Sequence, residues 1–219
     1  MTSIEKQKTL PECVLERASN TPGRVWTPGD FADIGGRDAI DKALQRMVKN
    51  NQLRRIERGL YDRPSFNSLT GKPTVPDYRA VIDAVARRDK VRCLIDGMTA
   101  ANELGLTNAV PAKIEILVDA RLKPITLGNQ KIIFKNAAPS RLYWAGRPGM
   151  YLVQALHWLH DVMASDVEKS KVDQTVRKLL NDKQNGTRLA DDLRTGLSAM
   201  PIWMQDILRK PLAFSDRAA

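Results

Sequence analysis

The stretch LQRMVKNNQLRRIERGLYDRP, from Leu44 to Pro64, combines regularly spaced apolar residues with a dense group of basic ones. Between Arg37 and Arg63 there are eight basic side chains and four acidic ones. Lysine and arginine neutralise phosphate charge, so a surface of this kind suits a nucleic-acid backbone. The sequence on either side indicates which fold would present that surface.

Residues 37–49 are predicted to form a helix. Ile40, Leu44, Met47 and Val48 recur with the helical period of about 3.6 residues and mark the buried side. The opposite side carries the polar residues, which are Asp38, Lys42, Gln45, Arg46 and Lys49. This amphipathic pattern predicts a helix with a charged outer face.

The residues before this helix predict two more helices and a short strand. A first helix is expected over residues 4–18, and a strand at Val25 and Trp26. Thr27, followed by a proline and by Asp30 three residues later, is typical of a capping box at a helix start. The short helix that begins there is expected to end before Gly35 and Gly36. Helix, tight turn and helix together are typical of a helix-turn-helix.

The residues after this helix predict a β-hairpin. Residues 53–56 and 60–61 are short enough for two strands, and Gly59 has the conformational freedom that the turn between them needs. A hairpin directly after the outward-facing helix would make the unit a winged helix.

The overall fold class is predicted to be α+β with two domains. Residues 64–76 are rich in serine, glycine, proline and threonine, a linker composition. We therefore expect a winged helix-turn-helix over residues 1–65, a linker over 66–76, a mixed α/β domain with a small sheet over 77–165, and C-terminal helices packed on it over 166–219.

Within the second domain, helices are expected at residues 77–89, 99–104 and 150–163. Strands are expected at 91–95 and 114–118, with a hairpin of residues 125–127 and 131–134 about Gly128 and Asn129. Two or three further helices are predicted between residues 171 and 210.

Composition favours an anionic partner and a reducing compartment. The 219 residues are 42% apolar and carry a formal charge of +10, with the excess in the first two thirds of the chain. Such a charge fits nucleic acid, although it also serves solubility alone. Cys13 and Cys93 lie far apart and outside any CxxC pair, as free thiols would. With no apolar run near the roughly 20 residues of a membrane span and no signal-peptide pattern, a cytoplasmic protein is expected.

Eight side chains are the candidate DNA contacts. Lys42 and Gln45 would reach base edges in the major groove, and Arg37 would meet a phosphate or a guanine. Arg54, Arg55 and Arg58 would contact the DNA backbone or the minor groove. Arg46 and Lys49 on the helix complete the set of candidates. The alternative is a protein-interaction module with a merely solvated charged face, and Asp38 and Asp41 count in its favour.

No catalytic, metal or cofactor site is predicted. His157 and His160, the only histidines, have a spacing that could hold a metal, but their apolar surroundings favour core or boundary positions. Asp96 and Asp119 follow strands, where turn chemistry explains them as well as catalysis does. Trp203 is expected in the core, with a partner anchor as the alternative.

The stretch WTPGDFADIGGRDAIDKALQRMVKNNQLRRIERGLYDRP (residues 26–64) resembles the N-terminal winged helix of AbiEi-like antitoxins. The segments DGMTAANELGL (96–106), VPAKIEILVD (110–119), LKPITLGNQKIIFKNAAPSRL (122–142) and VQALHWL (153–159) follow that family's order of elements. The resemblance covers roughly residues 20–165.

This resemblance implies an antitoxin of a toxin–antitoxin system. The family's winged helix binds inverted repeats upstream of its own operon and represses it, and its second domain neutralises a nucleotidyltransferase-like toxin. The matching positions for DNA contact are Arg37, Lys42, Arg54, Arg55 and Arg58. Direct contact with the toxin varies across such systems and stays open. The basic group Arg87, Arg88, Lys90 and Arg92 fits either a second DNA contact or an acidic protein partner.

Overall fold

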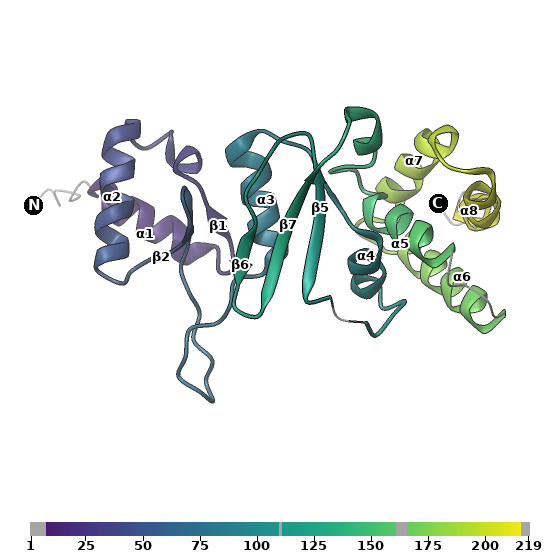
Figure 1. The fold of residues 1–219 in the computed structure, drawn as a ribbon, viewed down its shortest axis with the longest axis horizontal. Helices are drawn as coiled ribbons and strands as arrows, with labels where there is room; N and C mark the ends of the chain where they lie inside the picture. Colours follow the sequence, from purple (N-terminus) through teal and green to yellow (C-terminus); the bar gives the residue numbers. More distant parts are fainter. Residues whose placement is uncertain (1–7, 110, 161–165, 216–219) are drawn as a thin grey trace, which may run out of the picture. The chain divides into compact units, whose positions relative to one another are not determined.

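A computed structural model of the chain describes residues 8–109, 111–160 and 166–215, and it has the predicted α+β class (Figure 1). The described residues form two compact units. The first reaches from the N-terminal side to Val91 and includes 125–129. The second contains 92–124 and the described residues from Gln130 onward.

The first unit begins with a helix and a short strand, and two further helical segments follow. Its elements are α1 (Leu10–Asn20), β1 (Val25–Trp26), the 3-10 helix η1 (Pro28–Phe31), α2 (Arg37–Lys49), β2 (Arg54–Glu57), β3 (Leu60–Asp62) and α3 (Tyr78–Asp89). The three strands form an antiparallel sheet in the order β1-β3-β2. The core between helices and sheet contains Phe31, Ile40, Leu44, Met47 and Tyr61.

Capping boxes start two of these helices. Before α1, the backbone N–H of Thr9 donates to the Glu12 carboxylate over 2.7 Å, so α1 begins later than the predicted 4–18. Residues 4–7 of that expected helix lie outside the described residues. Before η1, Thr27 and Asp30 form the predicted box. This second helix is a single 3-10 turn, and its last residue is Phe31 rather than a residue next to Gly35.

Helix α2 has the predicted bounds, and its apolar side is buried as expected. Ile40, Leu44 and Met47 are each at most 1% exposed, and Val48 is partly buried. Burying one such side chain contributes roughly 1.5–3 kcal/mol. These residues therefore fix which face of α2 meets solvent.

The hairpin after α2 is tied to the end of that helix. The backbone N–H groups of Gln52 and Leu53 both donate to the Met47 carbonyl, at 2.9 and 3.3 Å. The turn between β2 and β3 has Gly59 at a φ of +73°, which L-residues rarely adopt. The hairpin prediction is confirmed, and the hairpin's place relative to α2 is set by these bonds.

The segment predicted as a linker forms an ordered loop. Phe66 and Pro73 form a β-bridge, and Thr74 donates its backbone N–H to the Ser65 carbonyl over 2.7 Å. Leu69 at the tip is 93% exposed. In Figure 1 this loop extends from the end of the hairpin as a closed turn.

Helix α3, which the sequence analysis assigns to the second domain, packs on the first unit. It contacts β1 and β3 and buries Val81, Ala84 and Val85. Asp77 caps it by accepting the Arg79 backbone N–H. The change of unit comes at Val91 and Arg92, after this helix, rather than in the serine- and proline-rich loop before it.

The second unit is built on three strands. They are β4 (Cys93–Ile95), β5 (Lys113–Val118) and β7 (Gln130–Asn136), with β5 antiparallel to β4 and parallel to β7. Strand β6 (Ile125–Leu127), which the chain joins to β7 through Gly128 and Asn129, belongs to the first unit. All four strands agree with the predicted ones to within a few residues.

Helices make up the rest of the second unit. They are α4 (Gly97–Glu103), α5 (Met150–His160), α6 (Asp166–Leu180), α7 (Gly186–Gly196) and α8 (Ile202–Ser215), with short 3-10 turns at Pro139–Leu142 and Leu197–Ala199. Helix α4 packs closely against α5, because a Cβ at Gly97 would lie 2.6 Å from that of Trp158. The last residues of the predicted helix 150–163 lie outside the described part.

Candidate nucleic-acid interface

One face of α2 carries cations that have no ion-pair partner among the described residues. Lys42, Gln45, Arg46 and Lys49 are exposed and lie three or four residues apart, so they share one side of the helix. Among the residues that the structure describes, none of the three cations has a carboxylate within ion-pair distance. Their charge is therefore available to a ligand.

The first turn of α2 is less cationic than the sequence suggests. The Arg37 side chain is 70% exposed, and its Nε donates to Asp41 Oδ2 over 2.9 Å. Asp38 occupies the same first turn, where its charge is favourable near the helix N-terminus. The available positive charge therefore lies from Lys42 onward, after the first turn of α2. An exposed ion pair contributes little, about 0–1 kcal/mol, so Arg37 can leave Asp41 for a phosphate.

Arg54 has a structural role in the hairpin. Its Nε and Nη2 donate to the two Asp62 carboxylate oxygens at 2.9 and 2.5 Å, and its Nη1 donates to the Thr74 carbonyl at 2.7 Å. Asp62 is buried, with 8% of its side chain exposed. All three guanidinium nitrogens are thus bonded within the chain. Arg54 joins β2, β3 and the following loop. These contacts within the chain account for an arginine at this position without a contact to phosphate.

Arg55 and Arg58 are the two hairpin arginines that face solvent. Along β2, burial alternates, so that Arg54 and Ile56 lie partly buried while Arg55 and Glu57 are exposed. Arg58 stands in the turn next to Gly59, where its backbone N–H donates to the Glu57 carboxylate and its carbonyl accepts from Arg88. In the described residues, neither guanidinium has an acidic partner.

The turn of the hairpin is held by α3. Arg88 Nη1 donates to the Arg58 carbonyl over 2.6 Å, and its other nitrogens bind Asp89. A Cβ at Gly59 would lie 3.2 Å from Arg88 Cδ. Helix α3 therefore braces the loop that carries Arg58.

Arg87 anchors the same helix to the sheet and to η1. Its Nε lies 3.1 Å from Asp30 Oδ1, its Nη2 donates to the Val25 carbonyl over 2.8 Å, and its Nη1 binds Asp83. In the second unit, Arg92 binds Asp119 at 2.9 Å. Four basic residues were considered for a second DNA contact. Three of them, Arg87, Arg88 and Arg92, have partners within the chain, and Lys90 is exposed. The pair Asp83–Arg87, four residues apart, was the one local signal of this arrangement.

The electrostatics at Asp30 reflect these bonds. Burial on its own would raise the pKa of Asp30, but the Thr27 backbone N–H and the Arg87 guanidinium stabilise the carboxylate more strongly. The pKa of Asp30 is therefore lowered from its ordinary value. An ionised Asp30 holds the start of η1 and the end of α3 together at neutral pH.

The two histidines are not core residues. His157 and His160 are both exposed on α5, and their rings lie 5.9 and 4.2 Å from the Trp203 ring, centroid to centroid. Trp203 itself is half-buried on α8 rather than in the core. Within the described ranges, no three histidine, cysteine or acidic side chains gather as metal ligands do. In the same part of the chain, none of the helices has the length and apolar character needed to cross a bilayer.

The predicted DNA contacts thus fall into two groups. Lys42, Gln45, Arg46 and Lys49 on α2 form an open face, and Arg55 and Arg58 on the hairpin face solvent. Arg37 and Arg54 have partners within the chain. We call the first group, with the two hairpin arginines, the basic face.

The family comparison places this chain without naming its activity. The chain belongs to a family of unknown function, DUF6088, whose match covers residues 15–184 and so includes both compact units. A search of curated proteins found no match. The function therefore has to be argued from the residues.

Proposed function

We propose that this protein is an antitoxin and transcriptional repressor that binds double-stranded operator DNA through the basic face. The observation that carries the proposal is the row of exposed cations on α2, which have no acidic partner in the described part of the chain and are followed by a hairpin that presents two more. Phosphate contacts by such side chains supply salt-sensitive affinity, and those facing the bases supply sequence preference.

The topology of the first unit supports a winged-helix interpretation. Two helical elements precede α2, and a hairpin follows it in a sheet of order β1-β3-β2. In that interpretation α2 enters the major groove, where Lys42 and Gln45 reach base edges. Arg46 and Lys49 bind phosphates at one end of the helix, and Arg55 and Arg58 bind the backbone beside it.

The antitoxin role rests on the resemblance to AbiEi-like proteins. It assigns repression of the protein's own operon to the first unit and neutralisation of a nucleotidyltransferase-like toxin to the second. No single residue of the second unit carries this assignment. A neighbouring gene that encodes such a toxin would support it.

A protein-interaction module that pairs with a toxin without reading DNA is the second candidate. The observation in its favour is the acidic first turn of α2, where Asp38 is exposed and Asp41 holds Arg37. Acidic side chains repel phosphate, and a recognition helix normally presents its N-terminal residues to the bases.

Fluorescence anisotropy with two duplexes separates these candidates. One duplex is the DNA upstream of the protein's own gene, and the other is a scrambled duplex of equal length, each measured at two salt concentrations. We expect tighter binding to the native duplex that persists at the higher salt. If both duplexes bound equally and the higher salt abolished this binding, the binding would reflect the positive charge of the protein alone. That result would favour the interaction module.

Two double variants distinguish the parts of the interface. Replacing Lys42 and Gln45 with alanine should narrow the difference between native and scrambled duplex, because base contacts are lost. Replacing Arg55 and Arg58 with alanine should weaken binding to both duplexes alike and flatten the salt slope by roughly one unit per lost phosphate contact. Lys178→Ala on α6, an exposed cation of the second unit, is the matched control.

A further inference from the structure

The helices of the second unit line an open cavity of about 600 Å³ between α5, α6 and α8. Pockets that bind small organic ligands measure roughly 300–1,000 Å³. The cavity is lined by side chains from all three helices, and none of them belongs to the basic face. We therefore expect the cavity to have a role separate from DNA binding.

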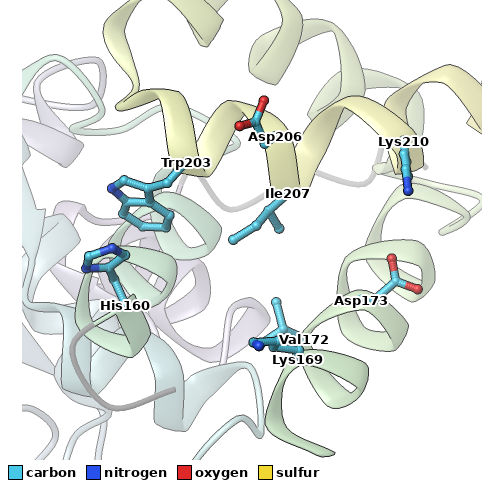
Figure 2. A pocket seen from close by; sticks show the side chains of 8 residues that line it. All are labelled: His160, Lys169, Val172, Asp173, Trp203, Asp206, Ile207 and Lys210. Carbon is cyan, nitrogen blue, oxygen red and sulfur yellow. The ribbon is translucent and has the colours of Figure 1, made fainter. Parts of the chain in front are cut away.

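The lining changes in character along the cavity (Figure 2). Trp203 and His160 lie together at one end, with ring centroids 4.2 Å apart. Ile207 from α8 and Val172 from α6 face each other across the middle, and Lys210 and Asp173 stand at the other end. Lys169 lies beside Val172 in Figure 2, so the site has an aromatic end, a middle formed by two aliphatic side chains and a lysine, and a charged end.

Two carboxylates and two lysines line the cavity, and both carboxylates have partners among the described residues. Asp173 binds Arg177 on α6 at 2.7 Å, and Asp206 on α8 binds Arg209 at 2.9 Å. Both carboxylates are thus partly neutralised by arginines of their own helices. Lys210 has no carboxylate within ion-pair distance among the described residues. An anionic group on a ligand would be attracted to it.

We propose that this cavity binds a small amphipathic organic anion, with a planar or aliphatic apolar body and one terminal carboxylate. The apolar body lies against Trp203 and between Ile207 and Val172, where its burial drives binding. The carboxylate pairs with Lys210 at the open end. Ligand and DNA then occupy different units of the protein.

Isothermal titration calorimetry of the full chain tests this with 1-naphthoate and its neutral counterpart 1-naphthalenemethanol. Compounds of this size bind a fitting pocket with a Kd on the order of 0.1 mM. We expect naphthoate to bind roughly five-fold more tightly than the alcohol, which is what one half-exposed ion pair contributes. Equal affinities, or no binding of naphthoate at millimolar concentration, would overturn the proposal.

Two variants locate the binding. Lys210→Met should lower the affinity for naphthoate to that for the alcohol and leave the alcohol unchanged. Ile207→Trp, which fills the middle of the cavity, should abolish binding of both. Lys178→Met, an exposed lysine on α6 outside the lining, is the control and should change neither.

Thermal melting of each variant separates loss of a site from loss of the fold. Lys210→Met removes only an exposed charge, so it keeps the test valid even where Ile207→Trp unfolds the unit. Binding of naphthoate that is unaffected by Lys210→Met would contradict the assignment of the carboxylate, and with it the ligand class.

Discussion

Helices α2 and α3 lie in the same unit and both carry several basic side chains, but the two sets of cations behave differently. On α2, Lys42, Arg46 and Lys49 face solvent with no acidic partner in the described structure. On α3, Arg87 and Arg88 bind carboxylates and backbone carbonyls of the chain itself. A count of basic residues would rate the two helices alike, and only the partners show which charge is free to meet DNA.

The distribution of acidic residues explains this difference. Helix α3 has Asp83 one turn before Arg87 and Asp89 directly after Arg88, and Asp30 approaches from η1. After Asp41 the chain has no acidic residue until Glu57, so Arg46 and Lys49 have no acidic neighbour within one helical turn. Lys42 has Asp38 one turn before it, but no ion pair forms between them among the described residues. On the hairpin, Arg54 likewise binds the carboxylate of Asp62, whereas Arg55 has no acidic partner among the described residues.

The largest effect on stability is expected from Arg87→Ala. It leaves Asp30, whose side chain is 11% exposed, without its main cation, and it frees the Val25 carbonyl. Because the pair is mostly but not fully buried, we expect a loss of about 2–3 kcal/mol in the free energy of unfolding. Urea denaturation followed by circular dichroism measures it.

Lys49→Ala on α2 is the matched comparison for Arg87→Ala. An exposed, unpaired lysine contributes at most about 0.5 kcal/mol to stability. Equal destabilisation by the two variants would remove the distinction between the helices.

A smaller effect is expected within the hairpin. Arg54→Ala should lower the free energy of unfolding by about 1–2 kcal/mol, since it leaves the buried Asp62 unpaired and frees the Thr74 carbonyl. Arg55→Ala should leave stability unchanged but weaken DNA binding. If Arg54→Ala weakened DNA binding of the folded protein more than Arg55→Ala does, the assignment of Arg54 to structure and of Arg55 to DNA contact would be wrong.

The smallest expected effect is a pH dependence that Asp30 contributes. The pKa of Asp30 is lowered in the folded protein, so its ionised form adds stability at neutral pH. That contribution is lost as the pH falls below the ordinary aspartate range and through the folded pKa. In Asp30→Asn the unfolding free energy should therefore fall less between pH 7 and pH 3 than in the wild type. Parallel pH profiles of the two proteins would show that folding does not lower the pKa of Asp30.

Local sequence signals predicted the elements of the basic face. Helix α2, its buried stripe and the glycine turn of the hairpin follow from spacing and capping within a few residues. The resemblance to antitoxins predicts a use for these elements, and it stays a prediction.

Interactions between distant residues were not predictable in the same way. The Arg87–Asp30 pair joins residues 57 apart, and the Arg54–Thr74 bond joins residues 20 apart. A linker composition likewise gave no sign of the bridge between Phe66 and Pro73. Bonds of this kind hold α3 against the first unit, and they occupy the guanidinium of Arg54, which is then not available to DNA.

The salt dependence of DNA binding tests the central claim most directly. It would be measured by anisotropy on the native upstream duplex for the wild type, for the triple variant Lys42→Ala, Arg46→Ala, Lys49→Ala, and for Lys90→Ala as an exposed control near α3. The account predicts that the triple variant lowers the slope of log K against log salt by roughly two to three units, and that it does so more than Lys90→Ala, which loses at most one phosphate contact. An unchanged slope in the triple variant would contradict the assignment of α2 as the DNA-binding helix.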